Sequence, residues 1–229
     1  MLAVMIDRIL ENKVSGKLNK GKAIIILGAS QVGKTTLLEK TFLQHDDVLW
    51  LAGDSPDAKA LFESSSAERL RLFFGNKSTV IISEAHLIPE IGQRLKLITD
   101  HIKEVQLIAT GSSSFDLSGR LKEPLTDRKW EYRLFPLSFG EMVTHRGLPA
   151  EKRSLMHRLV YGYYPEVINH PGEEQHILKR LAEHYSYQDI LMLEHVRKPD
   201  RIIKLMQVLA CKVGDQVSFH ELGQLCNSP

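Results

Sequence analysis

The stretch that decides the fold is Gly28-Ala29-Ser30-Gln31-Val32-Gly33-Lys34-Thr35-Thr36, which directly follows an apolar run at residues 23–27. It fits the pattern G-x-x-x-x-G-K-[ST] of a phosphate-binding loop. Glycines at both ends of the loop let backbone N–H groups turn inward around a polyphosphate, and the helix that follows directs its positive end at the same charge. All nine residues are therefore expected to line a nucleotide site.

Two side chains of this loop carry specific chemistry. The Lys34 ammonium is expected to reach the β- and γ-phosphates, and the Thr35 hydroxyl is expected to ligate Mg²⁺. A tight glycine turn with an exposed lysine is the alternative interpretation. The buried strand predicted before the loop and the amphipathic helix predicted over residues 36–42 argue against it.

Composition indicates a globular protein. The chain has 229 residues, 43% of them hydrophobic and 25% charged, which is enough for one α/β domain and a smaller appendage. A formal net charge of +2 is too small to indicate nucleic-acid binding by electrostatics alone. Asp7 and Arg8 interrupt the N-terminal apolar pattern, which argues against a signal peptide, and no stretch is long enough for a membrane span. Cys211 and Cys226 lack the spacing of zinc ligands. We expect a cytoplasmic protein with reduced, packed thiols and no membrane partner.

The first 137 residues alternate between short apolar runs and helical segments, which predicts a parallel sheet covered by helices on both faces. The fold class is therefore α/β, a three-layer P-loop NTPase core over residues 1–137. The predicted strands are residues 23–27, 48–52, 79–82, 105–110 and 130–135.

Beyond the core, strand signals nearly stop. Ser138-Phe139-Gly140-Glu141 is a capping box, and residues 138–197 are expected to form a helical lid or linker, with 155, 156, 159 and 160 on one apolar face. Residues 198–229 have the pattern of the first half of a winged helix: a helix, a short strand near Val217 and a second helix after Ser218. Asn227-Ser228-Pro229 resembles the start of a third helix. We therefore expect a truncated fragment that binds DNA poorly, because its recognition helix would be missing.

Acidic chemistry is expected at the end of the third strand. Glu84 follows Thr79–Ser83 and is placed to polarise an attacking water, although a solvated acid at a strand end is the alternative. P-loop hydrolases commonly place an aspartate before that glutamate to hold magnesium, and here Ser83 stands there. A hydroxyl lacks the full charge that a hard cation prefers, so weaker Mg²⁺ coordination and slowed hydrolysis are expected.

Other candidates follow the fourth strand. Thr110 or Ser112 could orient the attacking water and sense the γ-phosphate, with a helix cap as the alternative for the serine. Arg120 could stabilise transferring phosphate charge, with a surface arginine as the alternative. Guanine specificity is not expected, because Asn76-Lys77 lacks the following aspartate of N-K-x-D and precedes the third strand.

The combination of motifs resembles a family of prokaryotic AAA-type ATPases that continue through a winged helix into a C-terminal nuclease-like domain. The resemblance spans nearly the whole chain, but that last domain is absent. It implies an ATP-binding core with sheet order 5-1-4-3-2, Glu84 as base and Thr110 or Ser112 as sensor. The motifs that carry it are Gly28–Thr36, Ile81–His86, Thr110–Ser114, Ser118–Arg120, Pro136–Glu141, Tyr161–Val167 and Tyr187–Ile190.

Two functions follow as expectations. The first is an ATPase that converts Mg²⁺·ATP binding and hydrolysis into motion acting on DNA or a protein partner, with an oligomer allowed. The second is a nucleotide-gated binding module with little hydrolysis, because the usual magnesium carboxylate is missing. A DNA-binding regulator with a vestigial nucleotide fold is a third, weaker alternative.

Overall fold

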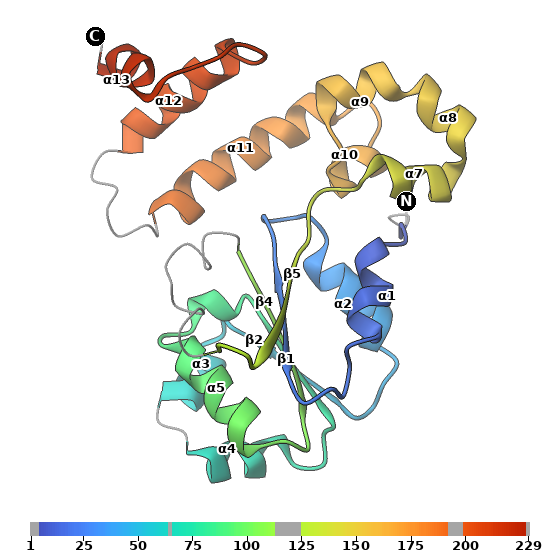
Figure 1. The fold of residues 1–229 in the computed structure, drawn as a ribbon, viewed down its shortest axis with the longest axis vertical. Coiled ribbons are helices and arrows are strands. Elements are labelled where there is room, and N and C mark those ends of the chain that lie inside the picture. The colour runs from blue at the N-terminus through green and yellow to red at the C-terminus, as the bar shows by residue number, and fades with distance from the viewer. Residues whose placement is uncertain (1–4, 64–65, 113–124, 192–198, 228–229) are drawn as a thin grey trace. The chain divides into compact units, whose positions relative to one another are not determined.

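The computed structural model describes residues 5–63, 66–112, 125–191 and 199–227, and its centre is a five-stranded parallel sheet (Figure 1). The strand order is β2-β3-β4-β1-β5, which is the predicted order 5-1-4-3-2 counted from the other edge. The α/β P-loop fold class and this topology are therefore confirmed. The strands are β1 (Ala23–Leu27), β2 (Val48–Ala52), β3 (Thr79–Ser83), β4 (Gln106–Gly111) and β5 (Lys129–Arg133).

Helices cover both faces of the sheet, as the continuous burial of β1 requires. Ile24 and Ile26 pack with α1 and α2, whereas Ile25 and Leu27 pack with α3, α4 and α5 (Figure 1). The side chains of β1 alternate between two apolar clusters because successive residues of a strand point to opposite faces. The core helices are α1 (Ile9–Ser15), α2 (Lys34–Phe42), α3 (Pro56–Glu63), α4 (Ala67–Phe74) and α5 (Ile91–His101), with a short 3₁₀ turn, η1 (Ala85–Leu87).

The chain after β5 is helical, as predicted. The whole chain divides into two compact units, Met1–Ile177 and Leu178–Pro229. The predicted apolar face of α9 is largely exposed, with Met156, Leu159 and Val160 each at least 70% accessible. The helices of this part are α7 (Phe139–Arg146), α8 (Leu148–Arg153), α9 (Leu155–Tyr161), α10 (Pro165–Asn169), α11 (Glu174–Leu191), α12 (Pro199–Cys211) and α13 (Phe219–Asn227).

A buried polar cluster holds α8, α9 and the segment before α10 together. Glu151 is fully buried and accepts a hydrogen bond of 2.9 Å from the Tyr163 hydroxyl. The Arg158 guanidinium lies 3.5 Å from the same carboxylate and is also buried. Burial and the bond to Glu151 raise the pKa of Tyr163. The tyrosine therefore stays a neutral donor that ties the segment before α10 to α8.

The C-terminal segment departs from one expectation. The predicted strand near Val217 does not form, since residues 216–218 have no regular structure, but the predicted helix after them does. Ser218 caps α13 by accepting from the Glu221 N–H at 3.1 Å. Cys211 is exposed rather than packed, and neither it nor Cys226 forms a disulfide. In the described ranges, no helix combines the length and apolar character needed to cross a bilayer.

Glu141 joins the N-terminal segment to the first helix after the sheet. Its carboxylate accepts from the N–H groups of Ser138 (2.8 Å) and Ile9 (2.9 Å) and from the Arg8 guanidinium (3.0 Å). The capping box predicted at Ser138 is therefore present in full. Burial alone raises the pKa of Glu141, but these hydrogen bonds and the charge of Arg8 outweigh burial and hold the pKa below its ordinary value.

Glu141→Gln is expected to lower the free energy of unfolding by about 2 kcal/mol, because it leaves the buried Arg8 charge uncompensated. A carboxyl group whose pKa is lowered by folding stabilises the fold at pH values above its ordinary pKa. That stabilisation is lost as the pH falls through the pKa of the folded state. Stability of the variant should therefore change less on acidification. Urea unfolding followed by fluorescence tests this, since both tryptophans lie in the sheet. Glu63→Gln, an exposed control, should match the parent protein.

Candidate functional site

The loop after β1 has the geometry of a phosphate cradle. An ideal Cβ on Gly28 would lie 2.4 Å from the Leu134 carbonyl oxygen, so only glycine allows this approach to the chain after β5. Gly33, the residue before α2, has φ of +97°, and Gln31 has φ of +62°. Positive φ values within such a loop turn successive N–H groups toward a common concave side, which suits an anion.

Lys34 lies at the mouth of this loop. The residue is 5% exposed, and its ammonium donates to the carbonyl oxygens of Gly28 (2.9 Å) and Ala29 (3.0 Å). The Glu84 carboxylate is 3.9 Å from the same ammonium. These partners compensate the burial of the charge, which would otherwise be strongly unfavourable. The structure thus brings together the lysine and the glutamate that the sequence singled out from segments 50 residues apart.

Glu84 is held in an unusual backbone conformation. Its φ and ψ are 46° and 40°, in the left-handed region, and its N–H donates to the Thr110 hydroxyl at 3.2 Å. That conformation costs a residue with a side chain roughly 1–2 kcal/mol. The Thr110 side chain thereby positions Glu84, whereas its predicted direct role as a sensor stays a prediction. Because β3 and β4 are neighbours, the strand order itself creates this contact.

Two residues near Glu84 were missed by sequence reasoning. His86 Nδ1 lies 3.4 Å from the Glu84 carboxylate. Gly53 lets β2 approach β3: an ideal Cβ there would lie 2.4 Å from the Glu84 carbonyl oxygen, and its N–H donates to the Ser83 carbonyl at 2.7 Å. Because His86 is two residues after Glu84, its position in the sequence could have indicated that it lies near the acid. No local pattern indicated the role of Gly53.

The remaining candidates have different surroundings. Ser30, Gln31, Thr35 and Thr36 are exposed along the loop and the first turn of α2. Val32 is buried in the apolar cluster beneath the loop, so its side chain packs and only its backbone is available. Ser112 is buried at the end of β4. Arg120 lies outside the described residues.

The oxygen donors here fit a magnesium ion that shares its ligands with phosphates. Thr35 and Ser83 offer hydroxyls, and the half-exposed Glu84 side chain offers a carboxylate. Mg²⁺ typically binds one or two carboxylates plus substrate phosphates and keeps several waters. Within the described ranges, no three His, Cys, Asp or Glu side chains form a group that could hold a metal. The donor set therefore suits an ion that arrives with a nucleotide.

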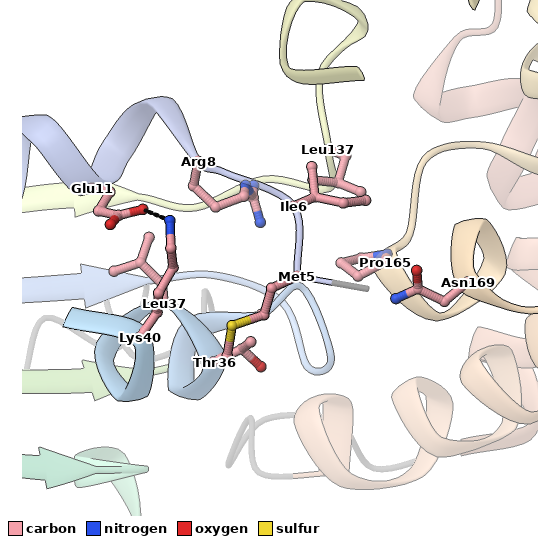
Figure 2. A pocket seen from close by; sticks show the side chains of 11 residues that line it. Met5, Ile6, Arg8, Glu11, Thr36, Leu37, Lys40, Leu137, Pro165 and Asn169 are labelled. Atoms are coloured by element: carbon pink, nitrogen blue, oxygen red, sulfur yellow. Dashed lines mark hydrogen bonds and ion pairs between the residues drawn. The ribbon is translucent and has the colours of Figure 1, made fainter. Parts of the chain in front are cut away.

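A cavity of about 130 Å³ opens beside the start of α2 (Figure 2). It lies between the N-terminal segment with α1, α2, the residue Leu137 and α10. Gly33 and Thr36 belong both to this cavity and to the predicted phosphate loop, so the two are contiguous. Five apolar side chains, five polar or charged side chains and one glycine line it: Met5, Ile6, Leu37, Leu137 and Pro165, then Arg8, Glu11, Thr36, Lys40 and Asn169, and Gly33.

Arg8 forms one wall of this cavity and was not recognised from sequence as a site residue. Its guanidinium donates to the Val32 carbonyl at 2.8 Å and to the Phe135 carbonyl at 2.6 Å, in addition to Glu141. The side chain is 8% exposed. A single buried arginine therefore contacts the phosphate loop, the exit of the sheet and the cap of α7.

Known proteins resemble this chain over most of its length. It is 21% identical to an uncharacterized protein of Methanocaldococcus jannaschii, over 95% of this chain and 53% of that protein, so the chain spans about half the length of this curated relative. The solved structure of a Walker-type ATPase of Pyrococcus abyssi is similar in fold, with a TM-score of 0.57, 18% identity and coverage of 96% of this chain and 88% of that one.

Two family models match separate parts of the sequence. Residues 152–228 match a domain of unknown function, DUF8612. Residues 20–143, more than half of the chain, match an AAA domain and include the phosphate loop, Glu84 and all five strands. The chain therefore belongs to the AAA domain family.

Proposed function

We propose that this protein binds Mg²⁺·ATP and hydrolyses it, coupling the nucleotide state to motion of its helical parts. The observation that carries the proposal is the buried Lys34 ammonium, which lies on the carbonyls of Gly28 and Ala29 and 3.9 Å from Glu84. A cation, an inward-turned loop and an acid at one sheet edge are the groups that phosphoryl transfer requires. Family membership and the Walker-type ATPase fold support it.

Each residue has a distinct proposed role. Lys34 and the N–H groups of residues 28–36 bind the phosphates, and the Thr35 hydroxyl, with Ser83, holds the magnesium, which neutralises phosphate charge when bound. Glu84 accepts a hydrogen bond from the attacking water and orients it. Thr110 keeps the Glu84 backbone in place through its 3.2 Å hydrogen bond. Ser112 and Arg120 are proposed to sense and stabilise the γ-phosphate.

The cavity beside α2 is proposed to hold the adenine base. It adjoins the first turn of α2, so a nucleotide whose phosphates lie in the loop can reach it with its base. Leu37, Leu137 and Pro165 offer apolar contact surface for a flat ring, and Asn169 offers an amide that can both donate and accept (Figure 2). Burial of the base then adds affinity beyond that of the phosphates.

A second candidate function is a nucleotide-gated binding module. Ser83 favours it, because this position at the end of β3 carries a neutral hydroxyl, which donates to the Leu51 carbonyl at 3.5 Å. A neutral group there stabilises magnesium less than a carboxylate does, which slows hydrolysis more than binding. In both functions the partner that responds to the nucleotide is proposed to be DNA or a protein.

Lys34→Ala is expected to weaken binding of Mg²⁺·ATP by at least roughly tenfold, since it removes a charge-assisted contact to the phosphates. Isothermal titration calorimetry measures this directly. Lys96→Ala makes the same charge change on the exposed side of α5 and should bind as the parent does. Equal affinities for all three proteins would refute the proposed phosphate site.

Ser83→Asp is expected to raise the rate of phosphate release by roughly 10- to 100-fold, because it restores negative charge beside the magnesium. The matched control is Ser83→Asn, which has the shape of aspartate without its charge. Phosphate release under saturating Mg²⁺·ATP distinguishes the two functions. Tight binding without turnover in either variant would support the gated module over the ATPase.

Asn169→Trp is expected to fill the cavity and weaken ATP binding by about tenfold, the effect of losing roughly 1.4 kcal/mol of base contact. Inorganic tripolyphosphate, which has no base, should bind the variant as well as it binds the parent. The neighbouring exposed residue supplies a control, since His170→Trp adds the same ring outside the cavity. If tripolyphosphate weakened as much as ATP, the assignment of the cavity to the base would be wrong.

A further inference from the structure

We propose that Arg8 is a positioning residue, which fixes the orientation of a peptide in the phosphate loop and ties that loop to the first helix after the sheet. The inference rests on the proposed nucleotide function and adds a residue that lies outside the loop motif. Arg8 precedes β1 by 15 positions, and no pattern in the loop points to it.

The contacts of the guanidinium use three separate nitrogen atoms. Nη1 donates to Val32, Nη2 to the Phe135 carbonyl, and Nε to the Glu141 carboxylate, at 2.8, 2.6 and 3.0 Å. A planar guanidinium presents these donors in a fixed fork, so the three acceptors are held in one mutual arrangement. The single ammonium of a lysine offers one point of charge and cannot reproduce that geometry.

The bond to Val32 acts on the loop through its backbone. Val32 directly precedes Gly33 and Lys34, and the carbonyl and the N–H of a trans peptide point in opposite directions. With its carbonyl oxygen bonded to Arg8, the Val32–Gly33 peptide directs the Gly33 N–H away from Arg8. The hydrogen bond from Arg8 restrains the plane of this peptide. That restraint matters because Gly33, with φ of +97° and no side chain, is otherwise among the least restricted residues of the loop.

Glu141 makes this arrangement dependent on the helix that follows the sheet. It compensates the Arg8 charge while capping α7 through Ser138, so displacement of α7 would remove the compensating carboxylate from the guanidinium. A buried cation without its partner is strongly unfavourable. The position of α7 and the orientation of the loop peptide are therefore coupled through one side chain, which gives the nucleotide site a direct mechanical link to the helical part.

Arg8→Lys tests the proposal by calorimetry with two ligands, Mg²⁺·ATP and inorganic tripolyphosphate with magnesium. Because Arg8 acts on the loop, the variant should bind both ligands about tenfold more weakly, the effect of losing one or two hydrogen bonds to a charged group. Asp7→Asn is the matched control. It removes the exposed Asp7–Lys40 ion pair of 2.7 Å in the same segment but leaves the loop contacts intact, so its affinity for tripolyphosphate should not change.

The outcomes separate the possible roles of Arg8. Unchanged tripolyphosphate affinity in Arg8→Lys overturns the inference. If ATP affinity is also unchanged, Arg8 has a purely structural role. If ATP affinity alone is weakened, Arg8 only lines the cavity. Equal weakening in Asp7→Asn also overturns it, because loose tethering of the segment would then suffice. If Arg8→Lys does not fold, Glu141→Gln serves, with weaker binding of both ligands expected and unchanged binding contradicting the inference. If Lys34→Ala leaves affinity unchanged, the proposed function itself fails, which is distinguishable from failure at Arg8 alone.

Discussion

The burial of one ammonium group at the start of α2 is the constraint on which this site depends. Lys34 is almost wholly inaccessible, and a cation in such surroundings needs acceptors on several sides. The loop supplies them with the carbonyls of Gly28 and Ala29, and Gly28, which has no side chain, also allows the loop to approach the chain after β5. The loop that would receive phosphate is thus also the loop that compensates the lysine.

The strand order extends this constraint to the catalytic candidates. Since β4 lies between β1 and β3, the residues at its carboxyl end are next to both the phosphate loop and the acid after β3. Thr110 pairs with Ile26 on one side, and its hydroxyl holds Glu84 on the other. A different order of the same strands would separate these groups, so topology and chemistry are linked through one central strand.

The sequence predicted what short-range patterns determine. The predicted strand limits agree with the observed ones to within two residues, and the glycine-lysine loop indicated the class of α/β fold. Both predictions succeeded because apolar runs and glycine spacing are local properties of the sequence. Arg8, Gly53 and the cavity were missed because their roles arise from contacts between segments distant in the chain. The strand expected near Val217 did not form. An isolated strand needs a partner with which to pair, and composition alone does not provide one.

The backbone of Glu84 has a consequence for how the protein responds to selection. Its left-handed conformation is one that glycine or asparagine adopts at lower cost, so replacing the acid with either would relax the main chain while removing the carboxylate. With the proposed role of Glu84 in hydrolysis, screens for heat resistance and screens for turnover would favour opposite residues at this position. A thermostable but inert variant altered at Glu84 would reflect the common trade-off between stability and activity.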